Sequence, residues 1–165
     1  MQPASRLVLG PDDGETVRLR ALGVRFVLDG AMTGRRFSLV EHPLGARRLG
    51  APLHTHHNED EYSYVLEGRF GVQLGTEVLE VGPGDFVMKP RGIEHTFWNA
   101  GDEPGRLLEL ISPAGFEDYF REMAAALAAP ERDDAVTAAI ARRYGLDIDV
   151  ATIPLLAERH GLRLA

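Results

Sequence analysis

The chain has 165 residues, of which 44% are apolar and 26% charged, as is typical of a single folded domain. Its formal net charge of −7 argues against a basic surface that would bind nucleic acid or an anionic membrane. The absence of cysteine excludes disulfides, thiolate metal sites and cysteine nucleophiles.

Residues 1–112 are predicted to form a β-barrel. From residue 7 onward, Gly, Pro or Asp interrupts the chain every few residues, with short runs rich in Val, Leu and Phe between them. Many short strands without a helical period favour a sandwich or a barrel. The predicted strands are Val24–Leu28, Phe37–Val40, Tyr62–Leu66, Phe70–Leu74, Val78–Val81, Phe86–Lys89, Thr96–Asn99 and Leu107–Ile111.

Residues 113–165 are predicted to form a helical C-terminal extension. Apolar residues recur there at spacings of three and four, which is typical of an amphipathic helix: Phe116, Tyr119, Phe120, Met123 and Leu127. A second helical stripe ends at Gly145, and a short third helix is expected to end at Gly161. We expect this tail to pack on the barrel or on a partner subunit.

Around residues 141–146 the tail also resembles a helix-turn-helix motif. A DNA-binding motif of this kind needs a basic surface and a polar recognition helix. Residues 131–165 hold six acidic and five basic side chains, and Pro154 stands where the recognition helix would begin. A packing tail is therefore the preferred interpretation, and no nucleic acid is expected as a partner.

Three histidines and one glutamate are spaced as metal ligands would be. His54 and His56 are one residue apart, so in a strand both imidazoles point to the same face. Glu61 opens the next apolar run, and His95 begins a later strand just after a Pro-x-Gly turn. Neutral imidazole and carboxylate suit a borderline divalent metal such as Fe, Mn, Ni, Cu, Zn or Co. On an octahedral ion, these four ligands would leave two positions open for substrate or dioxygen.

Two stretches of the sequence resemble the two conserved motifs of the cupin superfamily. Motif 1 covers residues 48–68 and motif 2 covers residues 84–99. They read His54-Thr55-His56, Glu61, Gly68, and then Gly84, Pro90, Gly92, His95, Asn99. The one departure is Arg48, which stands where the family has a leading glycine, with Gly50 nearby. The resemblance implies a double-stranded β-helix of six to eight strands, with a metal held inside the barrel mouth by His54, His56, Glu61 and His95.

The resemblance is closest to small bacterial cupins that are similar to quercetin-type dioxygenases. It implies a metal-dependent dioxygenase as the leading function, acting on a small oxygen-bearing organic substrate, with Glu61 as a candidate general base. Two alternatives remain open: a non-catalytic small-molecule-binding or sensor module, and an isomerase or epimerase that uses no oxygen. A shared fold does not choose among these chemistries.

Other residues near the motifs carry weaker expectations. Ser63 and Phe97 share the inward parity of Glu61 and His95, so they are candidate substrate-pocket residues. Tyr64 and Trp98 are expected to face outward, where a helix or a partner subunit would cover them. His57 is expected to face solvent, and His42 and His160 to be structural or exposed. Glu59 and Asp60 are expected to form a solvated bend, with Glu59 as an alternative carboxylate ligand.

The cellular setting follows from absences in the sequence. No stretch of the chain is long and apolar enough for a signal peptide or a membrane span. The sequence therefore predicts a cytoplasmic protein that does not contact a membrane. A homodimer is expected by analogy with the family, through a strand edge that would otherwise be exposed.

Overall fold

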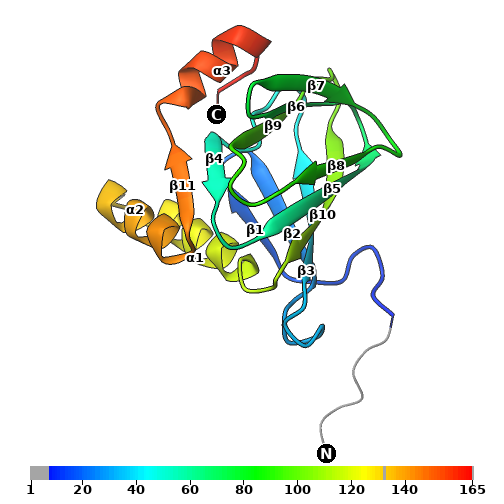
Figure 1. Ribbon diagram of the computed structural model, residues 1–165, viewed down its shortest axis with the longest axis vertical. Helices are drawn as coiled ribbons and strands as arrows, with labels where there is room; N and C mark the ends of the chain where they lie inside the picture. Colours follow the sequence, from blue (N-terminus) through cyan, green and yellow to red (C-terminus); the bar gives the residue numbers. More distant parts are fainter. Residues whose placement is uncertain (1–7, 132, 165) are drawn as a thin grey trace, which may run out of the picture.

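A computed structural model describes residues 8–131 and 133–164 of the chain. Ten strands form two facing antiparallel sheets, an eleventh strand from the tail joins the second sheet, and three helices follow the barrel (Figure 1). The predicted double-stranded β-helix with a helical C-terminal extension is confirmed. It has more strands than the six to eight that the family resemblance implied.

The first sheet has six strands in the order β1-β2-β3-β10-β5-β8. Their bounds are β1 Thr16–Leu19, β2 Leu22–Leu28, β3 Ser38–Leu44, β5 Asp60–Glu67, β8 Phe86–Lys89 and β10 Gly105–Ser112. Inward and outward residues alternate along β5 and β10, as expected when one face of a sheet is buried. The turn after β5 requires Gly68, whose φ is +86° and whose added Cβ would lie 2.7 Å from the Gly105 Cα.

The second sheet has five strands in the order β11-β4-β9-β6-β7. Their bounds are β4 Leu53–His56, β6 Phe70–Leu74, β7 Glu77–Val81, β9 His95–Asn99 and β11 Leu146–Asp149. Strand β11 is absent from the sequence-based prediction, which expected the tail to be helical throughout. Its four residues pair in antiparallel register with all four residues of β4.

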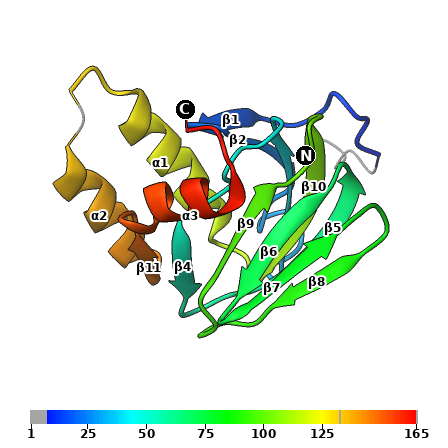
Figure 2. The ribbon, with the colours of Figure 1, turned by 90° about the horizontal axis from the view of Figure 1, so that it is seen from above.

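Three helices complete the fold: α1 Glu117–Ala128, α2 Asp134–Arg143 and α3 Thr152–His160. Seen from above, all three lie on the side of β4 and β11, away from β5 and β8 (Figure 2). Gly145 and Gly161 follow α2 and α3 with positive φ, as predicted for residues just past a helix end. None of the described helices is both long and apolar enough to cross a membrane.

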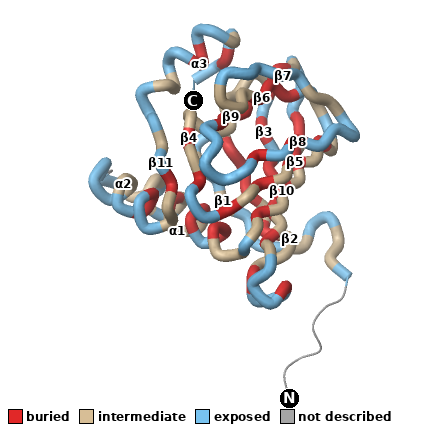
Figure 3. The backbone as a smooth tube through the Cα atoms, viewed as in Figure 1, coloured by how far each residue is buried: buried red, intermediate tan, exposed pale blue. Residues whose placement is uncertain are grey.

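Apolar side chains from both sheets pack together inside the barrel, and buried residues lie along strands of both sheets (Figure 3). The fully buried members include Val24, Val40, Leu44, Val65, Phe70, Leu107 and Ile111. Aromatic residues of α1 and of the segment before it extend this core. A smaller second cluster joins β9 to α3 through Trp98, Ala100, Ala157 and Leu162. The tail therefore packs on the barrel, and α3 covers Trp98 as the sequence suggested.

The outer face of the first sheet holds a carboxylate shared by two arginines. Glu41 accepts a hydrogen bond from Arg25 at 2.7 Å and another from Arg106 at 3.0 Å. Burial raises the pKa of Glu41, but the hydrogen bonds and charges of the two arginines outweigh burial and bring the pKa below its usual value. The three side chains link β2, β3 and β10 across the sheet.

We expect Glu41→Gln to lower the free energy of unfolding at pH 7. Because the pKa of Glu41 is lower in the folded than in the unfolded chain, its stabilising effect is complete above the unfolded pKa of about 4.3. That effect is lost as the pH falls through the folded-state pKa, so variant and wild type converge in acid. Urea denaturation from pH 3 to pH 8 measures the difference, with exposed Glu77→Gln as control. A difference independent of pH would contradict the prediction.

Candidate metal centre

Strand β4 supplies two of the four candidate ligands. Residues alternate along it between intermediate and buried positions, and the two buried ones are His54 and His56. Both imidazoles therefore point into the barrel, as the one-residue spacing predicted. On one side, β4 pairs with β9 at a single position, where His54 lies opposite His95.

The tail holds β4 on its other side. Strand β11 pairs with all of β4, including Leu146 opposite His56 and Ile148 opposite His54. Just beyond β4, the backbone NH of His57 donates to the Gly145 carbonyl at 2.9 Å. At its start, the NH of Leu53 donates to the Thr152 hydroxyl at 3.1 Å. The C-terminal extension is thus part of the framework that positions two of the histidines.

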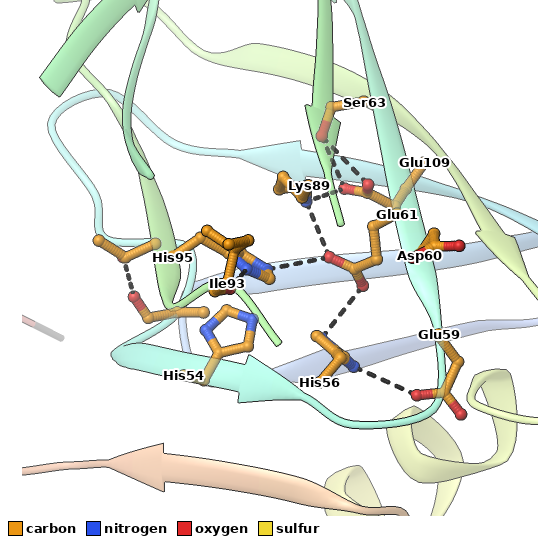
Figure 4. Close-up of polar contacts among 12 residues, drawn as sticks. His54, His56, Glu59, Asp60, Glu61, Ser63, Lys89, Ile93, His95 and Glu109 are labelled. Atoms are coloured by element: carbon orange, nitrogen blue, oxygen red, sulfur yellow. Dashed lines mark hydrogen bonds and ion pairs between the residues drawn. The ribbon is translucent and has the colours of Figure 1, made fainter. Parts of the chain in front are cut away.

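The other two candidate ligands come from the two different sheets. Glu61 is the first inward residue of β5, and its register partners are Lys89 on β8 and Ile111 on β10. His95 is the first residue of β9 and is 1% exposed. Each of the four residues offers one ligand atom, and those atoms all lie within 4.8 Å of one another (Figure 4). The structure therefore brings together the His-His-Glu-His group that the sequence singled out.

The δ nitrogens of the three histidines all face acceptors. His54 Nδ1 lies 2.8 Å from the Pro52 carbonyl oxygen, and His95 Nδ1 lies 2.9 Å from that of Ile93. His56 Nδ1 lies 3.5 Å from a Glu59 carboxylate oxygen. A carbonyl oxygen can only accept, so in His54 and His95 the δ nitrogen must carry the proton. In the neutral rings, the ε nitrogens then carry bare lone pairs.

Two of these ε nitrogens meet the Glu61 carboxylate. The distances are 3.3 Å from His56 Nε2 to Glu61 Oε1 and 3.2 Å from His95 Nε2 to Glu61 Oε2. Two acceptors in contact repel each other unless a cation, either a proton or a metal ion, lies between them. Burial lowers the pKa of His54 well below its usual value, which keeps that ring neutral and its lone pair available. The donor set therefore fits a divalent transition metal, since neutral imidazole and carboxylate are its preferred ligands.

A second buried group adjoins Glu61. The ammonium of Lys89 lies 2.9 Å from Glu61 Oε2 and 2.9 Å from Glu109 Oε2. The Ser63 hydroxyl lies 3.1 and 2.9 Å from the two Glu109 oxygens. Burial lowers the pKa of Lys89, but the two carboxylates outweigh burial and bring it above its usual value. Burial also raises the pKa of Glu61, yet His56 and Lys89 bring it well below its usual value.

The bend between β4 and β5 differs in part from the expectation. Glu59 is buried, with its carboxylate beside His56, because the chain turns back toward the barrel there. The expectation of a solvated Glu59 is wrong. Asp60 is half-buried and pairs with Arg91 at 2.8 Å, whereas the side chain of His57 is 53% exposed, as predicted, and lies 2.7 Å from Asp147.

The remaining predicted residues fall into place around the group. Ser63 and Phe97 both point inward and are buried; Ser63 is bound to Glu109 and Phe97 packs in the main core. Tyr64 lies on the outer face beside Phe86. His42 is buried and contacts the Gly23 carbonyl oxygen, and His160 stacks on Trp98 with ring centroids 3.9 Å apart.

Sequence reasoning missed Lys89, Glu109 and Phe116 as neighbours of the group. Lys89 is the only lysine in the chain, and Glu109 interrupts the inward apolar positions of a strand; either oddity could have drawn attention to it. Phe116 covers His56 edge-on with ring centroids 4.4 Å apart. It precedes α1, so no strand parity could have placed it against a histidine of β4.

Comparison with known proteins agrees with the fold. The family model described as a cupin domain matches residues 42–111. An uncharacterized protein of Methanocaldococcus jannaschii is 36% identical over 46% of this chain and 59% of its own length. The protein named "Probable oxidoreductase virH" of Hypocrea virens is 31% identical over 57% of this chain and 45% of its own length.

A solved structure gives the same result for the architecture. The RmlC-like cupin of Shewanella frigidimarina superimposes with a TM-score of 0.58 at 19% identity, covering 69% of this chain and 96% of that one. At such low identity the likeness concerns the fold alone. This chain spans between about two fifths and three fifths of the length of the curated relatives it matches.

Proposed function

The chain belongs to the cupin superfamily, and we propose that it is a mononuclear metal-dependent oxidoreductase of the dioxygenase type. Its substrate would be a small organic molecule that bears an oxygen atom able to bind the metal. The observation that carries the proposal is the convergence of the four candidate ligand atoms within 4.8 Å of one another, with His56 Nε2 and His95 Nε2 at 3.3 and 3.2 Å from the two Glu61 oxygens.

In this proposal the metal is held by the ε nitrogens of His54, His56 and His95 and by the Glu61 carboxylate. Fe, Mn, Ni, Cu or Zn all suit such a donor set. When bound, the ion supplies Lewis acidity and open positions at which an oxygen-bearing substrate and dioxygen can meet. The carbonyls of Pro52 and Ile93 orient His54 and His95, as a hydrogen-bonded partner of a ligating histidine normally does.

The residues around the group would set its environment. Glu59 would orient His56 through its δ nitrogen, and Phe116 would keep water from the same ring. We keep Ser63 and Phe97 as proposed pocket residues, although the Ser63 hydroxyl is engaged by Glu109. For Glu61, the lowered pKa favours the role of ligand over that of general base, because a weakly basic carboxylate is a poor proton acceptor at neutral pH.

Two other functions compete with this one: a binding or sensor module that turns nothing over, and an isomerase or epimerase that needs no oxygen. The likeness to a protein named as an oxidoreductase supports the first function over both, although it spans only part of each chain.

Elemental analysis followed by oxygen uptake tests the proposed function. We expect full-length protein, purified without chelators or a histidine tag, to carry about one equivalent of Fe, Mn, Ni or Cu. We then expect oxygen consumption with at least one member of a panel of flavonols and diketones. Zinc alone, or a redox metal without oxygen uptake across the panel, would favour the isomerase and binding-module functions. No metal even after reconstitution would contradict all metal-dependent versions.

The ligand assignment is tested by His95→Ala. We expect this variant to lose stoichiometric metal binding and yet to fold, because the alanine leaves the pairing of β9 with β6 intact. Metal content and the far-ultraviolet circular dichroism spectrum are the two measurements. His57→Ala is the matched control, since His57 is a neighbouring histidine that faces solvent. Full metal occupancy in the His95 variant would refute the assignment.

We further propose that the chain forms a homodimer through the outer face of the first sheet. Two rows of apolar side chains cross this face in register: Met88, Tyr62, Leu110 and Leu39, and then Phe86, Tyr64 and Leu108. Phe86 is 69% and Met88 62% exposed, and no described helix covers this side of the barrel (Figure 2). An apolar face of this kind on a soluble protein marks an interaction surface.

A second copy fits this face because its charges are already paired. Where the second row ends, Glu41 is bound to Arg25 and Arg106, so two copies can meet without burying an unpaired charge. We expect light scattering to give twice the chain mass of 18.1 kDa. Phe86→Glu combined with Met88→Glu should give monomers, whereas Val78→Glu on β7 of the other sheet should not. A monomeric wild type at micromolar concentration would contradict the proposal.

A further inference from the structure

Lys89 is a charged residue in the interior of the barrel. It is the last residue of β8, lies opposite Glu61 in register and is 2% exposed. Lysine is almost never buried to this degree unless it is paired. Its ammonium has two carboxylate partners, Glu61 and Glu109, each at 2.9 Å.

Stability alone does not account for this pair. A buried ion pair recovers about what its desolvation costs, and apolar residues of similar volume often serve as well or better. The next inward residue on the same strand is the apolar Val87, which packs in the main core. A lysine here therefore suggests a role toward its neighbour Glu61.

The contacts show what Lys89 does to Glu61. The Ser63 hydroxyl donates a hydrogen bond to Glu109, and the Lys89 ammonium contacts both Glu109 and Glu61 Oε2. These contacts link β5, β10 and β8 (Figure 4). The other oxygen, Glu61 Oε1, faces His56 Nε2 at 3.3 Å, whereas Oε2 lies 2.9 Å from the Lys89 ammonium and 3.2 Å from His95 Nε2. The two oxygens of one carboxylate are thus made unequal. Lys89 cannot itself be a ligand while charged, because an ammonium has no lone pair.

We propose that Lys89 is a positioning residue that restricts Glu61 to one-oxygen ligation, an inference that rests on the proposed metal function. By engaging Oε2, the ammonium leaves Oε1 and the three ε nitrogens as the ligand atoms that the chain provides. Any further coordination positions of a bound ion would then be left for external ligands. Without Lys89, Glu61 is free to turn or to offer both oxygens.

The variants must keep the fold while removing this contact. Lys89→Met alone would leave Glu109 buried without its cation, which is strongly destabilising. The test variant is therefore Lys89→Met combined with Glu109→Gln, which removes one charge of each sign. Glu109→Gln alone is the matched control, because its amide oxygen can still accept from Lys89. Thermal unfolding of each full-length variant reports whether it is folded.

Cobalt(II) is the probe, added to metal-free protein and followed by its visible d–d absorption and by its dissociation constant. We expect the wild type and Glu109→Gln to share one spectrum at saturation. The double variant should bind cobalt about ten- to a hundredfold more weakly, as loss of a partner of a ligand typically causes. Its spectrum at saturation should also differ, because the coordination of Glu61 has changed.

The outcomes separate this inference from the function on which it rests. If the double variant is folded and gives the wild-type spectrum at saturation, Lys89 does not position Glu61, whether or not the affinity has fallen. If the wild type binds cobalt and the double substitution leaves the cobalt spectrum unchanged, the inference about Lys89 is wrong. The proposed metal function is then unaffected. A wild type that binds no cobalt overturns the proposed metal function as well.

Discussion

The buried carboxylate of Glu61 is the group around which the interior of this protein is arranged. A carboxylate inside a barrel is costly unless each of its oxygens has a partner. Here Oε1 faces His56, and Oε2 faces His95 and Lys89. Strands of both sheets contribute these partners, so the two sheets meet at this charge. The apolar core alone would hold the sheets together, but it would not specify which polar side chains converge.

The Glu61 carboxylate has different kinds of neighbour on its two sides. On one side are imidazoles whose δ nitrogens face carbonyl or carboxylate oxygens, which leaves their ε nitrogens as the candidate metal donors. On the other side, Lys89 and Glu109 form a pair anchored by Ser63. The imidazole side offers donor atoms that suit a cation, whereas the other side already contains the Lys89 ammonium. This asymmetry is what distinguishes a potential metal centre from a network of ordinary buried ion pairs.

The C-terminal extension is part of this arrangement. Strand β4 carries two of the histidines but pairs with β9 at a single position, whereas β11 pairs with all of it. Helix α3 then packs against Trp98 on the outer face of the neighbouring strand. The tail thus pairs with the free edge of β4, and β11 becomes the edge strand of the second sheet. Among the described residues, no helix covers the outer face of the first sheet, and its apolar rows therefore remain exposed.

Local rules were enough to predict much of this protein from its sequence. Alternation in a strand placed His54 and His56 on one face, and the resemblance to the two cupin motifs implied that Glu61 and His95 would join them. The three helices and their glycine ends followed from apolar periodicity and from the need for positive φ. These features depend on short segments of the chain, so the sequence pattern alone predicts them.

The features decided only by the tertiary structure depend on partners far apart in the chain. Strand β11 is recognisable only beside β4, because four residues in a helical tail carry too little pattern of their own. Glu59 turns inward because His56 is there to face it. The single lysine could be read as a bias of composition until β10 and β5 placed two carboxylates around it. Whether a charged side chain can be buried depends on the residue that lies opposite it. The register between strands determines that partner and cannot be read from one segment of the sequence, whereas the alternation of side chains along a strand can.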